Sequence, residues 1–106
     1  MLEPSMITYE ITATVRNDLC EGYELYMRDR HIPDLLATGK FASATFLRTG
    51  DGNRYRIRYE AYGREALDGY LMEHAADLRR HFYETFPEGV TLEREEWEVL
   101  AIWDNQ

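Results

Sequence analysis

The sequence predicts an α+β fold in which four antiparallel strands form one sheet and helices cover one face of it. Three observations favour this class. Apolar and polar residues alternate in the segments expected to be strands, and apolar residues recur every three or four positions in the segments expected to be helices. Turn-forming residues separate these segments. At 106 residues we expect one domain, residues 1–106, with residues 1–5 disordered.

The first predicted strand spans residues 6–15, MITYEITATV. Every second residue is apolar, and together these residues form one face: Ile7, Tyr9, Ile11, Ala13 and Val15. The opposite face carries Glu10 and three threonines. A period of two with β-branched residues is typical of a strand that lies with one face against a core.

A helix is predicted next, with Asp18 as a candidate N-cap and Glu21 as its capping-box partner three residues later. Tyr23, Met27 and His31 follow at a spacing of four residues. Residues four apart lie on the same side of a helix, so His31 is predicted to project from the core-facing side near the helix end.

Pro33 predicts that a second helix begins there, because proline disfavours helical geometry in the preceding residue and fits a first helical turn. Gly39 predicts the end of that helix. Residues 40–49 and 54–62 are predicted to be strands. The sequence TGDGN, residues 49–53, is typical of the hairpin turn that would join them.

The second half predicts one long helix over about residues 64–85, a turn at residues 86–89 and a last strand over about residues 90–102. The helix carries an apolar stripe with one histidine in it: Leu67, Leu71, His74, Leu78 and Phe82. The resulting order, β-α-β-β-α-β, is that of the ferredoxin-like fold, in which the first and third strands are neighbours.

The sheet face away from the helices is predicted to be polar. Arg54, Arg56 and Arg58 share this face of the third strand, where Glu10 and Glu60 could pair with them. This face is either solvated or covered by a second copy of the chain, with the arginines against the partner's glutamate-rich last strand. We expect the homodimer.

Composition argues against several functional classes. A formal net charge of −8 is unsuited to nucleic acid and to anionic membranes, and no apolar run is long enough to span a bilayer. We expect a cytoplasmic protein because the N-terminus lacks the pattern of a secretion signal. The single cysteine, Cys20, excludes a disulfide framework and a cysteine-based zinc site. No nucleotide-binding motif is present, and no cofactor is expected.

Two segments, YMRDRHIPDLLATGKF and YRIRYEAYGREALDGYLMEHAADLRRHF, carry a family resemblance. The matching motifs are Met27, His31-Ile32-Pro33, Thr38-Gly39-Lys40-Phe41, Tyr55 to Tyr62, Glu65-Ala66-Leu67 and Ala75 to Arg79. Over most of residues 7–100 the chain resembles a family of short bacterial proteins known only as a domain of unknown function.

This resemblance implies the dimeric α+β barrel superfamily, in which two ferredoxin-like protomers join their sheets. The superfamily holds cofactor-free monooxygenases, haem-degrading enzymes, lactone isomerases, sugar mutarotases and non-catalytic ligand sensors. Its sites usually lie between the sheet and the helices of each protomer. The resemblance therefore suggests where a site lies, but no reaction.

His31 is the candidate catalytic residue, because a neutral imidazole facing the space between helices and sheet can carry protons. The candidate ligand-binding residues are His74, Tyr9, Tyr26, Tyr55 and Tyr59. Tyrosine hydroxyls can orient or protonate an oxyanion, and tyrosine rings can stack on an aromatic ligand.

A structural interpretation of both histidines competes with the functional one. In HIPD and HAAD, each histidine would bond the last carbonyls of one helix, and Asp34 or Asp77 would stabilise the start of the next. Metal binding by these motifs is disfavoured, because a bend at Pro33 would separate the two side chains of HIPD. We expect no metal site.

Three functions remain open. The chain is an enzyme for a small, aromatic molecule without a tightly bound cofactor, a non-catalytic ligand sensor, or an interaction dimer whose cleft is filled by its own tyrosines. The last of these predicts that the sheet tyrosines pack against those of the helices: Tyr9, Tyr55 and Tyr59 against Tyr23, Tyr26 and Tyr70.

Overall fold

The computed structural model describes residues 5–105. Its elements, in chain order, are β1 (Ile7–Val15), a 3₁₀ turn (Asn17–Leu19), α1 (Cys20–Tyr26), a π turn (Met27–His31), α2 (Ile32–Ala37), β2 (Phe41–Arg48), β3 (Arg54–Ala61), α3 (Arg64–Glu73), α4 (Ala75–Thr85) and β4 (Val90–Glu98). The predicted disorder of residues 1–5 falls, except for Ser5, outside the described residues.

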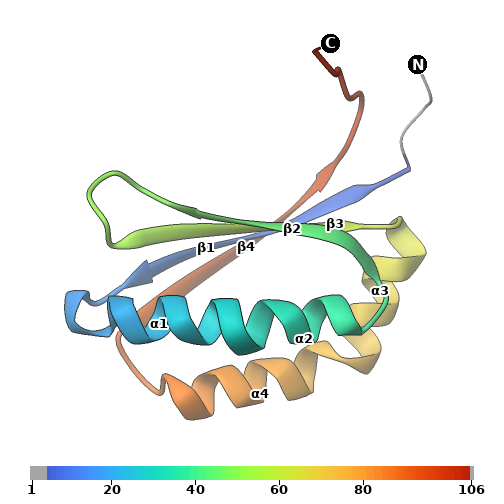
Figure 1. Cartoon of the computed structure of the whole chain (residues 1–106). Helices are drawn as coiled ribbons and strands as arrows, with labels where there is room; N and C mark the ends of the chain where they lie inside the picture. Colours follow the sequence, from blue (N-terminus) through green and yellow to red (C-terminus); the bar gives the residue numbers. More distant parts are fainter. Residues whose placement is uncertain (1–4, 106) are drawn as a thin grey trace.

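One antiparallel sheet with the strand order β2-β3-β1-β4 forms one layer, and the helices form the other (Figure 1). β1 and β3 are neighbours, with Tyr9 opposite Tyr59 and Ile11 opposite Ile57. The ferredoxin-like α+β prediction is confirmed. The largest fully buried side chains come from both layers: Tyr23, Tyr55, Tyr59, Leu35, Ile57, Leu67 and Val15.

The first helical segment differs from its prediction at both ends. The Asp18 carboxylate accepts hydrogen bonds from the Arg16 guanidinium and does not cap the helix. Pro33 does not begin a separate helix, because α1 continues through the π turn directly into α2. In that turn the Ile32 N–H bonds to the Met27 carbonyl, five residues back. This wider turn lets the helix pass Pro33, which has no N–H to donate.

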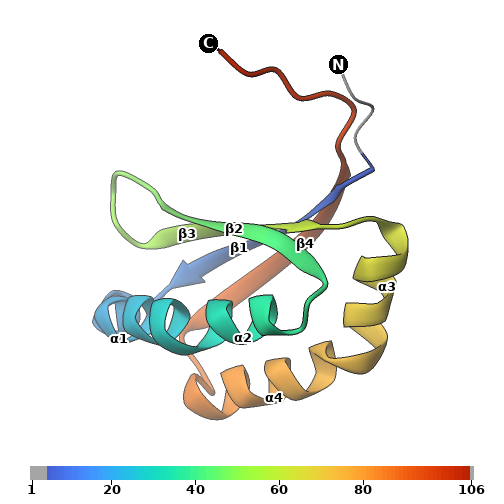
Figure 2. The same cartoon turned by 45° about the vertical axis from the view of Figure 1, so that its right-hand side comes forward.

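The predicted long helix over residues 64–85 is wrong, because the chain turns at His74 between α3 and α4. The backbone of His74 leaves helical geometry there, at φ −124° and ψ −32°. Figure 2 shows α3 and α4 running in different directions along the sheet layer. Tyr70 of α3 and Phe82 of α4, on either side of the turn, are both buried in the core. The last strand also ends earlier than predicted, at Glu98.

On the sheet face away from the helices, the predicted ion pairs between glutamates and arginines form for Glu10 but not for Glu60. Glu10 of β1 is only 7% exposed and forms ion pairs with Arg56 and Arg58 of β3, at 3.3 and 2.9 Å. Glu60 instead accepts a hydrogen bond from the Thr8 hydroxyl at 2.7 Å. Arg54 has no carboxylate within 4.0 Å among residues 5–105.

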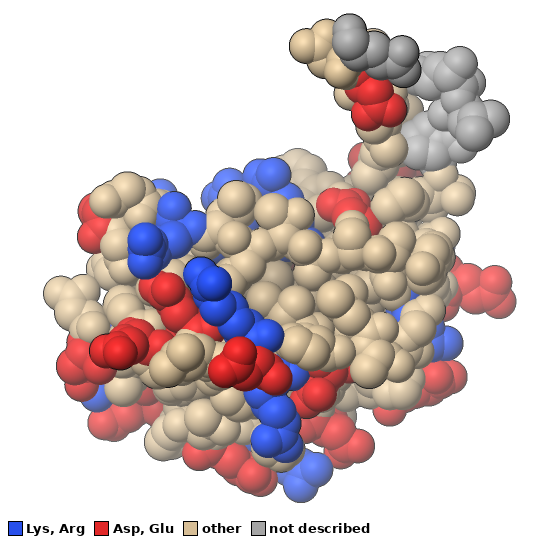
Figure 3. Space-filling model, in the orientation of Figure 1, with Lys and Arg blue, Asp and Glu red and all other residues tan. Residues whose placement is uncertain are grey.

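Large apolar side chains are exposed next to this face and beyond β4. Trp97 lies on β4 itself, and the segment after β4 carries Leu100, Ile102 and Trp103. Figure 3 shows this segment projecting from the body of the protein, while acidic and basic side chains mix over the helical layer. Exposed apolar side chains on a projecting segment are typical of an interface.

Gly89, in the turn between α4 and β4, should tolerate alanine least of the turn glycines. Its φ is +87°, and a Cβ added there would lie 2.5 Å from Leu19 Cδ1. Gly39 is the matched control, with φ +78° and no atom within 4 Å of an added Cβ. We expect Gly39→Ala to lower the free energy of unfolding by about 1 kcal/mol, from backbone strain alone. Gly89→Ala should cost about 2 kcal/mol or more, because Leu19 must also move. Urea unfolding measures both, and equal losses would contradict the steric argument.

Candidate functional site

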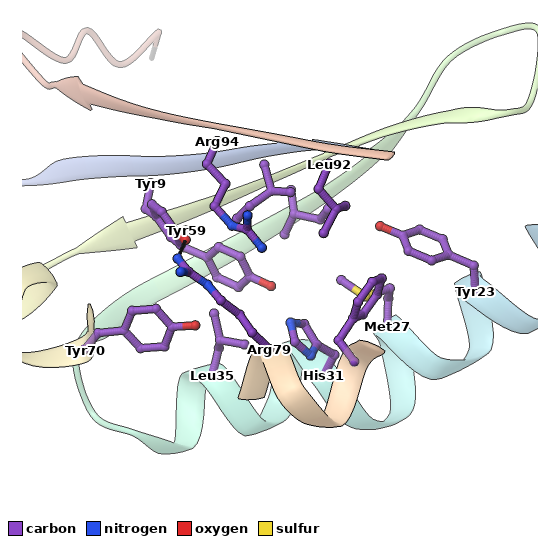
Figure 4. Close-up of a pocket in the computed structure, with 13 residues that line it drawn as sticks. Tyr9, Tyr23, Met27, His31, Leu35, Tyr59, Tyr70, Arg79, Leu92 and Arg94 are labelled. Atoms are coloured by element: carbon purple, nitrogen blue, oxygen red, sulfur yellow. Dashed lines mark hydrogen bonds between the residues drawn. The ribbon is translucent and has the colours of Figure 1, made fainter. Parts of the chain in front are cut away.

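A small cavity lies between the sheet and the helices (Figure 4). Its volume is about 30 Å³, which is room for one or two water molecules. The apolar part of its wall comes from both layers: Ile11, Ile57, Leu92, Leu35, Met27 and Phe82. The polar part holds four tyrosines, one histidine and two arginines: Tyr9, Tyr23, Tyr59, Tyr70, His31, Arg79 and Arg94.

Three polar atoms in this wall are buried without a hydrogen-bond partner among residues 5–105. They are Tyr23 Oη, Tyr59 Oη and His31 Nδ1. A buried polar group left without a partner costs about 1–3 kcal/mol, and folded proteins satisfy nearly all such groups. These three atoms are all the buried side-chain nitrogen and oxygen atoms without a partner in the described part of the chain. All three belong to residues that line this one cavity.

His31 is the last residue of the π turn, and Met27, the first residue of that turn, lines the same cavity. The imidazole packs against the rings of Tyr26 and Phe82, with centroids 5.9 and 5.6 Å away. Burial lowers the pKa of His31 to about 4, and the positive charge of Arg94 acts in the same direction. The imidazole is therefore neutral at physiological pH and can accept a proton.

The buried tyrosine hydroxyls have the opposite character. Burial raises the pKa of Tyr23, Tyr59 and Tyr70 above the usual value for a tyrosine. These hydroxyls stay protonated and can donate hydrogen bonds, so the wall combines donors with one uncharged base.

The structure brings only part of the predicted site set to the cavity. His31, Tyr9 and Tyr59 line it. Tyr55 points elsewhere, and its hydroxyl donates to a carboxylate oxygen of Glu24 at 2.6 Å. Tyr26 packs against the His31 ring but is not part of the wall.

His74 lies outside the cavity at the turn between α3 and α4. Its backbone carbonyl accepts a hydrogen bond from the N–H of Leu78, and its ring stacks on Tyr70 at 6.5 Å. His74 therefore lies at a corner, but among residues 5–105 its ring makes no hydrogen bond to the last carbonyls of α3, which the structural interpretation requires. His31 does not lie at a helix end, because the helix continues past it into α2. Its Nδ1 bonds no carbonyl among residues 5–105.

Sequence reasoning missed Arg79 and Arg94, which reach the cavity from α4 and β4 (Figure 4). Arg79 Nη2 donates to Tyr9 Oη at 2.9 Å. Arg94 carried a signal in the sequence. It follows Val90 and Leu92 on alternate positions of the last strand, where the period of two calls for another apolar residue.

The tyrosines of the two layers also pack against each other, as the hypothesis of a filled cleft requires. The ring centroids of Tyr9 and Tyr70 are 5.9 Å apart, and those of Tyr23 and Tyr55 are 4.9 Å apart. The protein's own side chains therefore fill most of the cleft. A ligand larger than one or two waters must displace side chains, and Met27, with its flexible thioether chain, is the one best suited to move.

Residues 5–105 hold no cluster of three or more histidine, cysteine or acidic side chains placed to bind a metal ion. None of the helices in this range is both long and apolar enough to cross a membrane.

Comparison with solved structures defines the fold as ferredoxin-like. SnoaB, a cofactor-independent oxygenase from Streptomyces nogalater, is 16% identical with a TM-score of 0.72, over 95% of this chain and 99% of that one. A monooxygenase from the gene ActVA-Orf6 of Streptomyces coelicolor, in complex with nanaomycin D, is 10% identical with a TM-score of 0.73, over 94% and 92%. A dimeric ferredoxin-like protein from an uncultured marine organism is 14% identical with a TM-score of 0.67, over 92% and 98%. At these identities the likeness shows the fold alone.

The family follows from the sequence. Residues 6–100 match the family described as a domain of unknown function, DUF4286, and the chain belongs to this family. The resemblance predicted from the His-Ile-Pro and Thr-Gly-x-Phe motifs is thereby confirmed. No curated protein matches the chain.

The unpartnered hydroxyl of Tyr59 predicts an unusual result for its removal. Tyr59→Phe should leave the free energy of unfolding unchanged or raise it by up to about 1 kcal/mol, because no hydrogen bond is lost. The matched control is Tyr55→Phe, which loses the bond to Glu24 and should cost about 1 kcal/mol. Chemical denaturation measures both variants. A loss in Tyr59→Phe as large as that in Tyr55→Phe would show that the Tyr59 hydroxyl serves the fold.

Proposed function

We propose that this protein binds a small, aromatic organic molecule in the cavity between sheet and helices, and acts on it without a tightly bound cofactor. The observation that carries the proposal is the gathering of Tyr23 Oη, Tyr59 Oη and His31 Nδ1, all unpartnered, at one cavity. A bound molecule with oxygen atoms would satisfy all three. The oxygenase and the monooxygenase of the same fold support the proposal by analogy.

His31 would be the proton acceptor, and the tyrosine hydroxyls would hold the oxygen that becomes negative. In the empty cavity burial lowers the pKa of His31 to about 4, so the imidazole is neutral and its Nδ1 is open to the hydroxyl of a phenol or an enol. The negative charge that forms as the proton leaves would raise the pKa of the imidazole and so favour the transfer. Tyr59 and Tyr23, whose pKa values are raised by burial, would donate hydrogen bonds to the resulting oxyanion. Tyr9, held by Arg79, would position the ring.

The test is a thermal-shift screen of small aromatic molecules against wild type, His31→Gln and Tyr59→Phe. A specific ligand should raise the wild-type Tm by mass action and raise it much less in the two variants. Tyr55→Phe is the control, since its hydroxyl lies outside the cavity, and it should keep the full shift. Equal protection of all four proteins, or of none, would overturn the proposal. Mass spectrometry of the identified ligand after incubation with the protein then separates an enzyme, which changes the ligand, from a non-catalytic sensor.

We also propose that the protein is a homodimer joined through its open sheet faces, in the cytoplasm. The face is self-complementary in charge: β3 carries Arg54, Arg56 and Arg58, and β4 carries Glu93 and Glu95 on the same side. A two-fold axis would set the arginines of one protomer against the glutamates of its partner. Exposed Trp97 adds apolar area, and a similar structure is dimeric. A single cysteine, half-buried, suits a reducing compartment.

Light scattering should therefore give twice the mass of one chain at micromolar concentration. Arg54→Glu should raise the dimer dissociation constant by about ten-fold or more, because it sets like charges opposite each other. Arg80→Glu on the far side of the molecule, in α4, is the charge-matched control and should leave the dimer intact. A monomeric wild type, or equal effects of both variants, would contradict the interface.

A further inference from the structure

Two arginines converge on the cavity from opposite layers. Arg79 comes from α4 and Arg94 from β4, and both guanidinium groups point toward the space beside Tyr9 and Tyr59 (Figure 4). Arg79 is half-buried, while Arg94 is exposed and lies at the mouth. The mouth is therefore positively charged on two sides.

The protein itself does not neutralise this charge. Neither Arg79 nor Arg94 has a carboxylate within 4.0 Å among residues 5–105, and no residue of the cavity wall is acidic. Most other basic side chains do have such a partner, for example Arg64 with Glu96 at 2.8 Å. The chain has 20 acidic residues for 12 basic ones, so a shortage of carboxylates does not explain the difference.

The position of Arg94 adds a second argument. β4 places it on the helix-facing side of the sheet, opposite Ile11 and two residues after Leu92. Two like charges at one mouth repel each other, and an anion bound by both guanidinium groups would relieve that repulsion.

The shape of the site limits which anion fits. Guanidinium groups bind planar carboxylates through paired hydrogen bonds. Behind the mouth the wall is apolar and aromatic, with Phe82 and Leu35, which suits a ring and not a fully hydrated inorganic ion. Tyr59 Oη and His31 Nδ1 lie further inside, where a ring hydroxyl would reach them.

We propose that the ligand of this cavity is a small aromatic carboxylic acid, with its carboxylate held between Arg79 and Arg94 and its ring directed toward Tyr59 and His31. This inference rests on the proposed function, because it assigns the chemical class of the ligand of the same cavity. The ring enters by displacing Met27, since the cavity of about 30 Å³ admits only water as it stands.

The test is calorimetric titration of benzoate and 4-hydroxybenzoate, each beside its neutral amide, into the wild type, Arg94→Gln, Arg79→Gln and Arg80→Gln. The carboxylates should bind at least about ten-fold more tightly than the amides. Arg94→Gln should remove about ten-fold of the carboxylate affinity and leave amide affinity unchanged. Arg79→Gln should remove at least as much carboxylate affinity and should also weaken amide binding, because it loses the bond that holds Tyr9. Arg80→Gln, next to Arg79 but paired with Asp77 outside the cavity, should change neither.

The outcomes separate this inference from the proposed function. Equal binding of acids and amides that His31→Gln abolishes would overturn the carboxylate and keep the aromatic ligand. Binding of neither class, together with a negative thermal-shift screen, would overturn both. Inorganic phosphate is the third probe, and competition by phosphate as effective as that by benzoate would mean that the arginines hold any anion and that the ring is not recognised. Because Arg94 is exposed, Arg94→Gln should fold even if Arg79→Gln, which loses the bond to Tyr9, does not.

Discussion

Acidification from pH 6.5 to pH 4 should lower the free energy of unfolding by about 3 kcal/mol more in the wild type than in His31→Gln. The pKa of His31 is about 4 in the folded protein and 6.5 in the unfolded chain. Below pH 6.5 the unfolded chain therefore binds a proton that the folded protein does not accept until about pH 4. The stability that the neutral buried imidazole contributes is fully present above pH 6.5 and is lost on the way down to pH 4.

The measurement is urea unfolding of both proteins at a series of pH values across this range. His81→Gln is the comparison variant, because it removes an exposed imidazole of α4, beside Arg30, in place of the buried one. Carboxylates also titrate in this range, but they are the same in all three proteins and cancel in the difference. Parallel curves for wild type and His31→Gln would show that the imidazole titrates normally and that burial does not lower its pKa.

Phe82→Ala should lower the free energy of unfolding by about 3–5 kcal/mol, the largest loss expected from one substitution near the site. Phe82 is 4% exposed and lies at the centre of the aromatic cluster of the helical layer. Its ring centroid is 6.2 Å from that of Tyr23, 5.6 Å from that of His31 and 5.5 Å from that of Phe86. Removing the ring opens a cavity and releases α4 from α1.

Two further variants serve as controls for this prediction. Tyr83→Ala removes a neighbouring ring that is 46% exposed and should cost less than about 1 kcal/mol. Phe82→Leu keeps most of the volume and should cost about 1–2 kcal/mol. Thermal and urea unfolding measure all three. If Phe82→Ala lost no more than Tyr83→Ala, the helical layer would not depend on this cluster, and the wall of the cavity would be less rigid than the packing implies.

The sheet could be predicted from the sequence because its signals are local. β1 shows a clear period of two, so its inward side, with Tyr9 and Ile11, follows without knowledge of its neighbours. The same holds for β3 with Tyr55, Ile57 and Tyr59. Once the element order was known, the ferredoxin-like topology made β1 and β3 neighbours and predicted the ion pairs of Glu10.

The helical layer was predicted less well, because the helix propensity of a segment does not determine how that helix packs against the twisted sheet. The stripe from Leu67 to Phe82 continues at a helical period through His74, yet the chain turns there. With the turn, Tyr70 packs against Tyr9 of the sheet while Phe82 packs against Tyr23 of the helical layer, which no local pattern records. For the same reason the π turn before Pro33 was read as the end of a helix.

By itself, the sequence determined the family, the fold class, the inward faces of β1 and β3 and the core-facing position of His31. Only the tertiary structure decided which of those inward side chains form a site. It placed Tyr55 on Glu24, left Tyr59 without a partner, and brought Arg79 and Arg94 together from two elements. The physical reason is the distance along the chain over which each signal acts. The periodicity of a segment indicates only the direction in which a side chain leaves its own backbone. Whether a polar atom finds a partner depends instead on side chains from distant segments that packing brings within about 3 Å.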